Sequence, residues 1–553
     1  MTTREQLQQT LCDRLFWHTA ERDDGIVAKH LFDHHEMDVV YAMDEATLFD
    51  SFFNYLQQIG VYPFLEHLDP QKQQRKNIAF FKMTLVFLMK VVGAIKTIDE
   101  INDLLLTDEL LMSMCGFNAY QVKNGSCQRG VKLRKTHKPE IRGSLCVDTV
   151  ANHIVKIGPR RIENFFNRCI EQLAKQGVFP KIIHAACDAT LYETTNKFKE
   201  CGRVTHKRKV KARGYRKSGE LKEVSVTLYG WKVWAIYEIK TGIPLAIKID
   251  TIEKPDNLHV LAVLQQAKEN VKISSTIDSL VLDRGFLDGK VLYEIDLQGH
   301  EFVIPLKRNM EAACDARQLA LDCESFAPVT REVEVVHGYG KNKYTEKVLT
   351  TLVGVPDLLT CDWFNPQGSK VNSTKKDYVP IPLNAVVVKT WDNKTPAPEK
   401  QVVFVTNIDI KDPFITFDRD DERSLMENKH FREVKQNWHF EHPPKKTKEG
   451  VYVQTYMTMG MKALTTAFLK WQQQQLQLEA LGKQSTWQMY RRKLKVLNRN
   501  KLIVFVGQHF GIFPSHEVFM LADVPVHKTE EELNINREQI YAKYTDVAVT
   551  ENS

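Results

Sequence analysis

The sequence has no closely paired cysteines. Its ten cysteines include no C-x-x-C pair and are scattered between Cys12 and Cys361. Zinc ribbons need such pairs, and disulfide-stabilised secreted domains are short and rich in cysteine. We therefore expect neither a zinc site nor a disulfide framework. Reduced cysteines are typical of a cytoplasmic protein.

The sequence also lacks a signal peptide and a long uninterrupted apolar run. Its first 16 residues contain no basic segment followed by an apolar one. The most apolar window, residues 78–95, contains Lys82 and Lys90, which favours a buried amphipathic helix over a membrane span. We expect no membrane association and find no internal repeat.

The charge balance is only mildly basic. There are 76 Lys and Arg against 69 Asp and Glu, which gives a net charge of +7. This value leaves nucleic acid, an anionic surface or no charged partner all open. Basic residues cluster in residues 121–138 and 203–222. Each cluster is either a solvated surface segment or a contact to the DNA backbone, and the sequence alone does not decide between them.

The length and the residue patterns predict several domains. A chain of 553 residues is too long for one compact core, and 43% hydrophobic and 26% charged residues are typical of a globular protein. Helical patterns dominate at both ends of the chain, and strand patterns dominate in between. We predict five regions: a helical region at 1–175, the first part of an α/β core at 176–310, a β-rich insertion at 311–412, the second part of the core at 413–480, and a helical region at 481–553.

Three acidic residues stand at the edges of predicted elements. Asp188 ends the apolar run KIIHAACD and Asp283 ends SLVLD, and both runs are typical of buried strands. Glu427 lies in a charged stretch that favours a helix. Each residue alone is better explained as a cap, a turn residue or a surface ion pair, such as Glu427 with Arg423. Together they could hold two Mg²⁺ ions, because Mg²⁺ prefers carboxylate oxygens and two such ions catalyse phosphodiester cleavage.

Two further segments predict local structure. The pair Asp256–Asn257 stands before an apolar-periodic stretch, so we expect it to cap a helix. The basic segment 203–222 contains Gly214 and Gly219, which make a continuous helix improbable, so we expect a loop or the tip of a hairpin.

The sequence resembles a known family, the DDE transposases of bacterial insertion sequences, in the insertion-sequence-4 group. The resemblance lies in short motifs spread over residues 180–470. Its members are Asp188-Ala-Thr190, Gly230-Trp-Lys-Val233, Thr241-Gly-Ile-Pro244, Asp283-Arg-Gly-Phe286, Phe404-Val-Thr-Asn407 and Arg423-Ser-Leu-Met-Glu427. Asp283 follows Asp188 by 95 residues and Glu427 follows Asp283 by 144, and the long second gap is where this group carries its β-rich insertion.

The resemblance implies a fold and a set of site residues. The fold is a multidomain α/β protein with a ribonuclease H-like mixed-sheet core, a β-rich insertion before the last catalytic helix, and helical N-terminal and C-terminal regions. Asp188, Asp283 and Glu427 would be the catalytic metal ligands for two Mg²⁺ ions, for which Mn²⁺ can substitute. The N-terminal region would bind the DNA ends. The residues expected to contact DNA are Arg284, Arg423, Lys435, Lys207, Arg208, Lys209, Lys211 and Arg213.

The helix motif of the family departs from its pattern at two positions. The family has Tyr three residues before the Arg and Lys seven residues after the Glu. Here Asp420 and Val434 stand at those positions, and Lys435 follows one place later. One step along a helix is a rotation of about 100° but a rise of only about 1.5 Å, so Lys435 could still reach the same groove.

The resemblance implies cut-and-paste DNA transposition. The reaction would be hydrolytic nicking at the element ends, followed by attack of the 3′-hydroxyl on target DNA. Double-stranded DNA would be the partner, a homodimer would form the synaptic complex, and the protein would be cytoplasmic and associated with the nucleoid of a prokaryote. Two alternatives remain open: a catalytically weakened DNA-binding descendant, and a ribonuclease H-like nuclease without strand transfer.

Overall fold

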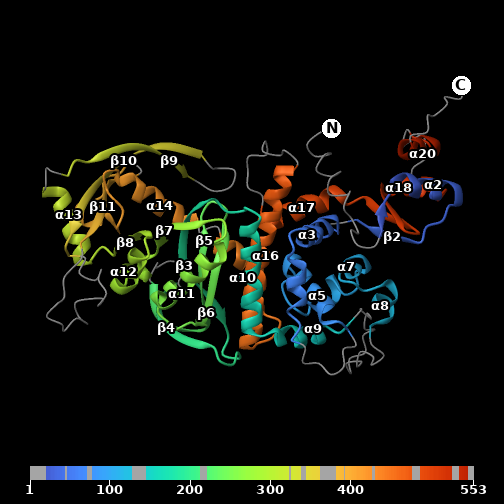
Figure 1. Cartoon of the computed structure of the whole chain (residues 1–553), viewed down its shortest axis with the longest axis horizontal. Coiled ribbons are helices and arrows are strands. Elements are labelled where there is room, and N and C mark those ends of the chain that lie inside the picture. The colour runs from blue at the N-terminus through green and yellow to red at the C-terminus, as the bar shows by residue number, and fades with distance from the viewer. Residues whose placement is uncertain are drawn as a thin grey trace. The chain divides into compact units, whose positions relative to one another are not determined.

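The computed structural model of the chain separates into two compact units (Figure 1). One unit comprises residues 158–460, and the other combines residues 1–157 with residues 461–553. The structure describes residues 20–43, 46–70, 78–126, 145–211, 221–322, 326–337, 344–360, 382–391, 393–425, 430–475, 486–525 and 535–545. The fold is mixed α/β, and no helix within these ranges is long and apolar enough to cross a membrane.

The unit of residues 158–460 is built on one mixed sheet. Its strands are β3 (Ile182–Thr194), β4 (Gly202–Lys211), β5 (Leu221–Glu238), β6 (Ile243–Thr251), β7 (Thr276–Leu282), β8 (Glu301–Pro305), β9 (Val329–His337), β10 (Tyr344–Leu358), β11 (Leu383–Thr390) and β12 (Val402–Thr406). The order is β4-β5-β3-β7-β8-β12-β11-β10-β9, and β6 pairs with β5. The pairs β3–β7 and β7–β8 are parallel, and the other pairs are antiparallel.

Helices complete this unit. They are α10 (Pro159–Lys175), α11 (Val260–Val271), α12 (Gly289–Leu297), α13 (Glu311–Asp322), α14 (Pro413–Leu425), α15 (Arg432–Asn437) and the first part of α16 (Lys448–Gln475), with short 3₁₀ turns η2 (Asp256–His259), η3 (Arg284–Phe286) and η6 (Pro398–Lys400). A connection between parallel strands needs a crossover, and α11 and α12 supply it between β6 and β7 and between β7 and β8.

The β-rich insertion continues the central sheet. Outward from β8 its strands follow in the order β12, β11, β10 and β9, and β12 pairs with β8 through Val405↔Ile304. The apolar alternation predicted strands in this region, and the structure has them. It also adds the helix α13 at the start of the insertion.

The second unit is mainly helical around a small sheet. Its helices are α2 (Asp24–His34), α3 (Ala46–Gln58), α4 (Tyr62–Glu66), α5 (Phe80–Val92), α6 (Ile101–Leu104), α7 (Glu109–Met114), α8 (Ala119–Asn124), α9 (Val147–Ile154), η1 (Val155–Ile157), α17 (Trp487–Asn498), α18 (Ser515–Leu521) and α20 (Arg537–Thr545). Its strands are β1 (Glu21–Arg22), β2 (Val39–Ala42), β13 (Lys501–Val506) and β14 (His509–Pro514), in the order β1-β14-β13-β2.

The sequence pattern predicted only helices in the C-terminal region, but the structure also has a hairpin there. The hairpin β13–β14 turns at Gly507, whose φ is +59°. β-branched and aromatic residues such as Ile503 and Phe505 favour strands, and β2 provides the pairing partner through Ile503↔Tyr41. The strand signal was present, but its partner lies about 460 residues earlier in the sequence.

The apolar window of residues 78–95 forms the buried helix α5. Eleven of its residues are buried, among them Lys90, whose exposed fraction is 1%. Its ammonium group lies 5.8 Å from the centroid of the Phe87 ring. Burial lowers the pKa of Lys90 to about 7, and the charge of Glu100 opposes this shift in part. Two lysines therefore do not make α5 a surface helix.

We expect Lys90→Met to change the pH dependence of stability. The pKa of Lys90 is lower in the folded protein than in the unfolded chain, so between pH 7 and about pH 10 the unfolded chain binds more protons. Stability should therefore rise with pH in this window, by up to about 1.4 kcal/mol per pH unit from this residue. Thermal unfolding across the window should show a smaller rise for the variant. Lys82→Met, at a half-buried position of the same helix, should leave the rise unchanged.

Candidate active site

Asp188 and Asp283 lie at the same level of two neighbouring parallel strands. β3 and β7 pair in parallel through Cys187↔Leu282, and each aspartate is the next residue in its chain. Adjacent strands are about 4.8 Å apart, so the two residues lie side by side at the carboxyl ends of the apolar runs. Both are half-buried. This adjacency joins positions that are 95 residues apart in the sequence.

The strands reach this point because their cores are apolar on both faces. Ala185, Ala186 and Cys187 are at most 1% exposed, and Leu280 to Leu282 are fully buried. Near-continuous apolar runs of this kind are typical of parallel strands that are covered on both sides. The first polar residue after each run is the aspartate. The Oδ1 atom of Asp188 accepts a hydrogen bond of 2.7 Å from the backbone N–H of Ala189.

The third predicted ligand, Glu427, lies outside the described residues. The convergence of the three predicted carboxylates therefore stays a prediction. Within the described residues, no group of three or more His, Cys, Asp and Glu is placed to hold a metal ion. The donor set that remains is a pair of adjacent carboxylates at Asp188 and Asp283. Hard carboxylate oxygens are suitable ligands for Mg²⁺.

Lys435 lies close to the first carboxylate strand. Its Nζ atom donates a hydrogen bond of 2.5 Å to the Leu191 carbonyl and lies 3.1 Å from Oε1 of Glu441. Leu191 follows Asp188 by three residues on β3, which is about 10 Å along the strand. The helix α15 therefore presents Lys435 on the strand that carries Asp188.

A π-helical turn precedes α15. It comprises His430 and Phe431. A π turn holds one more residue than an α turn, and such turns are frequent at functional sites.

The other predicted DNA contacts are distributed over three places. Arg284 is exposed in η3. Arg423 lies on α14, where the structure does not describe its side chain. The remaining residues are on or beyond β4: Lys207 is exposed, Arg208, Lys209 and Lys211 have described backbones only, and Arg213 lies outside the described residues.

The basic segment 203–222 includes the arms of a long hairpin. β4 and β5 pair over ten residues, from Gly202↔Gly230 to Lys211↔Leu221. Thr205 and Thr227 face each other, with 3.1 Å between their hydroxyl oxygens. The sequence allowed a loop or a hairpin tip, and the structure has strands up to Lys211.

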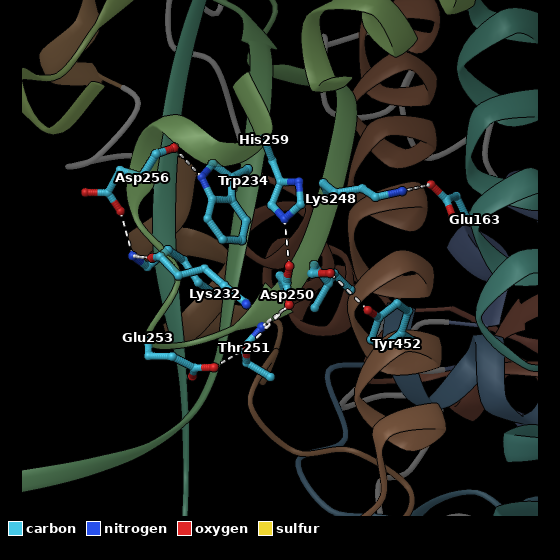
Figure 2. Close-up of polar contacts among 12 residues, drawn as sticks. Glu163, Lys232, Trp234, Lys248, Asp250, Thr251, Glu253, Asp256, His259 and Tyr452 are labelled. Atoms are coloured by element: carbon cyan, nitrogen blue, oxygen red, sulfur yellow. Dashed lines mark hydrogen bonds and ion pairs between the residues drawn. The ribbon is translucent and has the colours of Figure 1, made fainter. Parts of the chain in front are cut away.

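A polar network lies on the opposite face of the sheet from Asp188 (Figure 2). Asp188 pairs with Ala235, and side chains alternate along a strand, so Lys232 and Trp234 point to the other face. There Lys232 Nζ lies 2.7 Å from Oδ1 of Asp256 and donates to the Lys254 carbonyl at 2.5 Å. The Trp234 indole N–H donates to the Asp256 carbonyl at 2.6 Å.

A histidine and an aspartate complete the network. His259 Nε2 lies 2.8 Å from Oδ2 of Asp250, and the His259 ring meets the edge of Trp234 with 4.7 Å between centroids. Burial alone would raise the pKa of Asp250. Hydrogen bonds from His259 and from the Thr251 N–H outweigh it and hold the pKa of Asp250 below its ordinary value. The carboxylate is therefore ionised at neutral pH.

This network reaches the turn that carries Asp283. A Cβ atom on Gly285 would lie 2.6 Å from Oδ2 of Asp256, so the Asp256 carboxylate lies against the backbone of this glycine. Asn257 Nδ2 donates to Oδ2 of Asp288 at 2.9 Å. Asp288 in turn accepts from the Val291 N–H as the N-cap of α12. Gly285 in the Asp283 turn and Asp288 just after it are thus tied to the segment between β6 and α11.

The role of Asp256 and Asn257 differs from the expectation. The sequence predicted that they cap the following helix, but α11 begins at Val260 without a side-chain cap, and the two side chains contact Lys232 and Asp288 instead. The signal for Lys232 was its place in the Gly230-Trp-Lys-Val233 motif. No local pattern indicated which acidic residue it would meet.

Comparison with known structures finds distant similarity of fold. The sequence matches no family model and no curated protein. The fold is similar to that of a piggyBac transposase in a cryo-EM structure of its synaptic complex with hairpin DNA. The identity is 10%, the match covers 86% of this chain and 80% of that chain, and the TM-score is 0.36.

Proposed function

We propose that the protein is a DDE-type DNA transposase that cuts and joins DNA with Asp188, Asp283 and Glu427 as its catalytic carboxylates. One observation carries this proposal: Asp188 and Asp283, which the motifs single out, are neighbours one residue beyond the last pair, Cys187↔Leu282, of the parallel strands β3 and β7. The mixed sheet supports the ribonuclease H-like core that the sequence resemblance implies. Membership of the insertion-sequence-4 group, a homodimeric synaptic complex and a place in the prokaryotic nucleoid are parts of the same proposal.

The two aspartates fit a divalent cation. Their carboxylates would hold Mg²⁺, or Mn²⁺ in its place, with Glu427 as the third ligand. When bound, such ions activate a water or hydroxyl and neutralise charge on the attacking and leaving oxygens. Both aspartates are half-buried, so part of each side chain reaches the solvent.

The basic residues near the aspartates would position DNA. Lys435 is held beside β3 by the Leu191 carbonyl and by Glu441. Its charge, with those of Arg284 and Arg423, would stabilise a DNA phosphodiester beside Asp188 and Asp283. The exposed Lys207 and its neighbours on the β4–β5 hairpin would follow the backbone further along the duplex. These contacts position the DNA but do not read its sequence.

A cleavage assay on the element's own ends tests the proposal. The substrate is duplex DNA from the regions that flank the gene, incubated with the full chain and Mg²⁺. Cleavage followed by joining of the 3′ ends to a target supports the transposase. Binding without cleavage supports the DNA-binding descendant, and cleavage without joining supports the nuclease.

We expect Lys232→Met to weaken catalysis without touching DNA. The variant removes the ion pair that holds Asp256 against Gly285, so the Asp283 turn should lose its support from the far face of the sheet. Loss of a residue that orients a metal ligand costs about 10- to 100-fold in metal affinity or activity. Cleavage rates measured against Mg²⁺ concentration should show a higher requirement for the ion.

A second ion pair provides the control. Lys248 on β6 lies 3.1 Å from Glu163 on α10, and this pair appears in the same view (Figure 2). Lys248→Met should therefore keep the Mg²⁺ requirement of the unaltered protein. Equal effects of the two variants would contradict a specific role for Lys232.

A further inference from the structure

The excess positive charge of the chain is concentrated in one segment. Residues 480–516 contain seven Lys and Arg and no Asp or Glu. Outside this segment, 69 basic residues balance 69 acidic residues, so the segment carries the whole net charge of +7. Its described part contains α17, β13 and β14. A local excess of this size is an electrostatic footprint for a polyanion.

One face of α17 gathers the exposed cations. Arg492, Lys495 and Arg499 are exposed and are spaced three and four residues apart, which places them along one face of a helix. Arg499 follows the last helical residue and keeps a helical backbone. Val496 lies between these residues on the same face and is 73% exposed. We call these four residues the basic face of α17.

The opposite face of α17 fixes the helix in its unit. Trp487 is 2% exposed, and its indole N–H donates to the Val92 carbonyl at 2.8 Å. Leu494 and Asn498 are also buried. The guanidinium group of Arg491 lies 5.4 Å from the centroid of the Phe49 ring. Since buried residues hold the helix, its exposed cations form a fixed row on the surface of the unit.

We propose that the basic face of α17 binds the phosphate backbone of double-stranded DNA. This inference rests on the proposed function, which makes DNA the substrate. The face extends over about 10 Å of helix, and a duplex presents one negative charge per about 1.7 Å of its axis. The exposed Val496 suits the apolar parts of a DNA groove, such as a thymine methyl group.

A membrane surface fits this face less well. A helix that lies on a membrane inserts a broad apolar face, with its charges on the other side. On α17 the large apolar residues Trp487 and Leu494 are packed inside the protein, and the apolar residues exposed on its described part are Met489 and Val496. The face thus has the charge for a polyanion without the apolar surface for a bilayer.

A triple substitution tests the proposal. Arg492, Lys495 and Arg499 are changed together to Gln in the full chain, and binding to a labelled duplex from the element end and to an unrelated duplex is measured over a range of salt. Each lost phosphate contact lowers the slope of log affinity against log salt by about 0.9. We expect the slope to fall by up to about 2.7, and the affinity at low salt to fall about tenfold or more, for both duplexes.

The matched control removes the same charge elsewhere. Lys347, Lys400 and Lys411 are exposed residues of the unit of residues 158–460, and none is among the residues proposed to contact DNA. Their change to Gln should leave the slope within one contact of the unaltered protein. A further single variant, Val496→Asp, adds a negative charge at an exposed position and should weaken binding without a cost in folding. Thermal unfolding of every variant checks that the fold is kept.

Two results separate failure of this inference from failure of the proposed function. If the unaltered protein cleaves its element ends and both α17 variants bind like the control, the basic face does not bind DNA. If the unaltered protein binds neither duplex at any salt concentration, the proposed function fails together with the inference.

Discussion

Replacing Asp188 with Asn should abolish Mg²⁺-dependent cleavage of element-end DNA and leave the protein folded. The amide keeps the shape of the carboxylate, and its oxygen can still accept the hydrogen bond from the Ala189 N–H. It loses the negative charge that a cation needs. A bound cation contributes several kcal/mol to the transition state, and each 1.36 kcal/mol is tenfold in rate. We therefore expect a loss of roughly 10³-fold or more.

Asp283→Asn should lose as much cleavage activity, because Asp283 lies beside Asp188 at the end of the neighbouring strand. Asp278→Asn is the matched control, since Asp278 is on the same strand β7 but five residues earlier, about 17 Å away along the strand. Single-turnover cleavage and thermal unfolding are measured for all three. Wild-type rates for Asp188→Asn, or equal losses for all three variants, would contradict the proposed site.

Gly230→Ala should have the largest effect on stability. Gly230 has φ +155°, and a Cβ atom there would lie 2.0 Å from the carbonyl oxygen of Tyr192. A backbone oxygen in the middle of a sheet cannot rotate away as a side chain does. Overpacking costs about 1–3 kcal/mol and sometimes more, and here we expect about 3 kcal/mol or more.

The position of Gly230 explains why its backbone is so crowded. It is the last residue of β5 that pairs with β4, through Gly202, and Trp231 is the first that pairs with β6, through Thr251. β3 pairs with it on the other side through Glu193. The strand β5 thus exchanges its partner β4 for β6 at a residue that has no side chain.

Urea unfolding measures this prediction, and Gly177→Ala is its control. Gly177 also has a positive φ, of +69°, but a Cβ atom there would meet nothing within 4 Å. Its substitution should cost only the strain of the left-handed backbone, about 1 kcal/mol. Equal unfolding midpoints for the two variants would show that the contact with Tyr192 is not the cause.

The sequence predicted the elements of the site better than their assembly. The apolar runs before Asp188 and Asp283 are local patterns, and both form strands. β7 ends just before Asp283, as predicted, but β3 continues six residues beyond Asp188 to Thr194. Their parallel pairing depends on α11 and on β5 and β6, which separate them by tens of residues, so no local pattern predicted it.

The sequence did not predict which side chains meet across the sheet. Asp256 was interpreted as a helix cap because capping is a local interaction, yet its carboxylate meets Lys232 and the backbone of Gly285. The π turn at His430 was also unexpected. It depends on how α15 packs beside β3, where the Lys435 side chain is held by the Leu191 carbonyl. Such tertiary contacts override local preferences.

The small sheet of the second unit has a consequence for the order of folding. Its strands β1 and β2 are synthesised at the beginning of the chain, and their partners β14 and β13 emerge only after Lys501. At 5–20 residues per second the ribosome needs roughly 24 to 96 s between the two. The unit of residues 158–460 is complete by then, so the segment that is made first must wait, and its unit closes last. A polypeptide whose translation stops before β13 would keep the strand β2 without its partner, and an unpaired strand edge of this kind promotes aggregation.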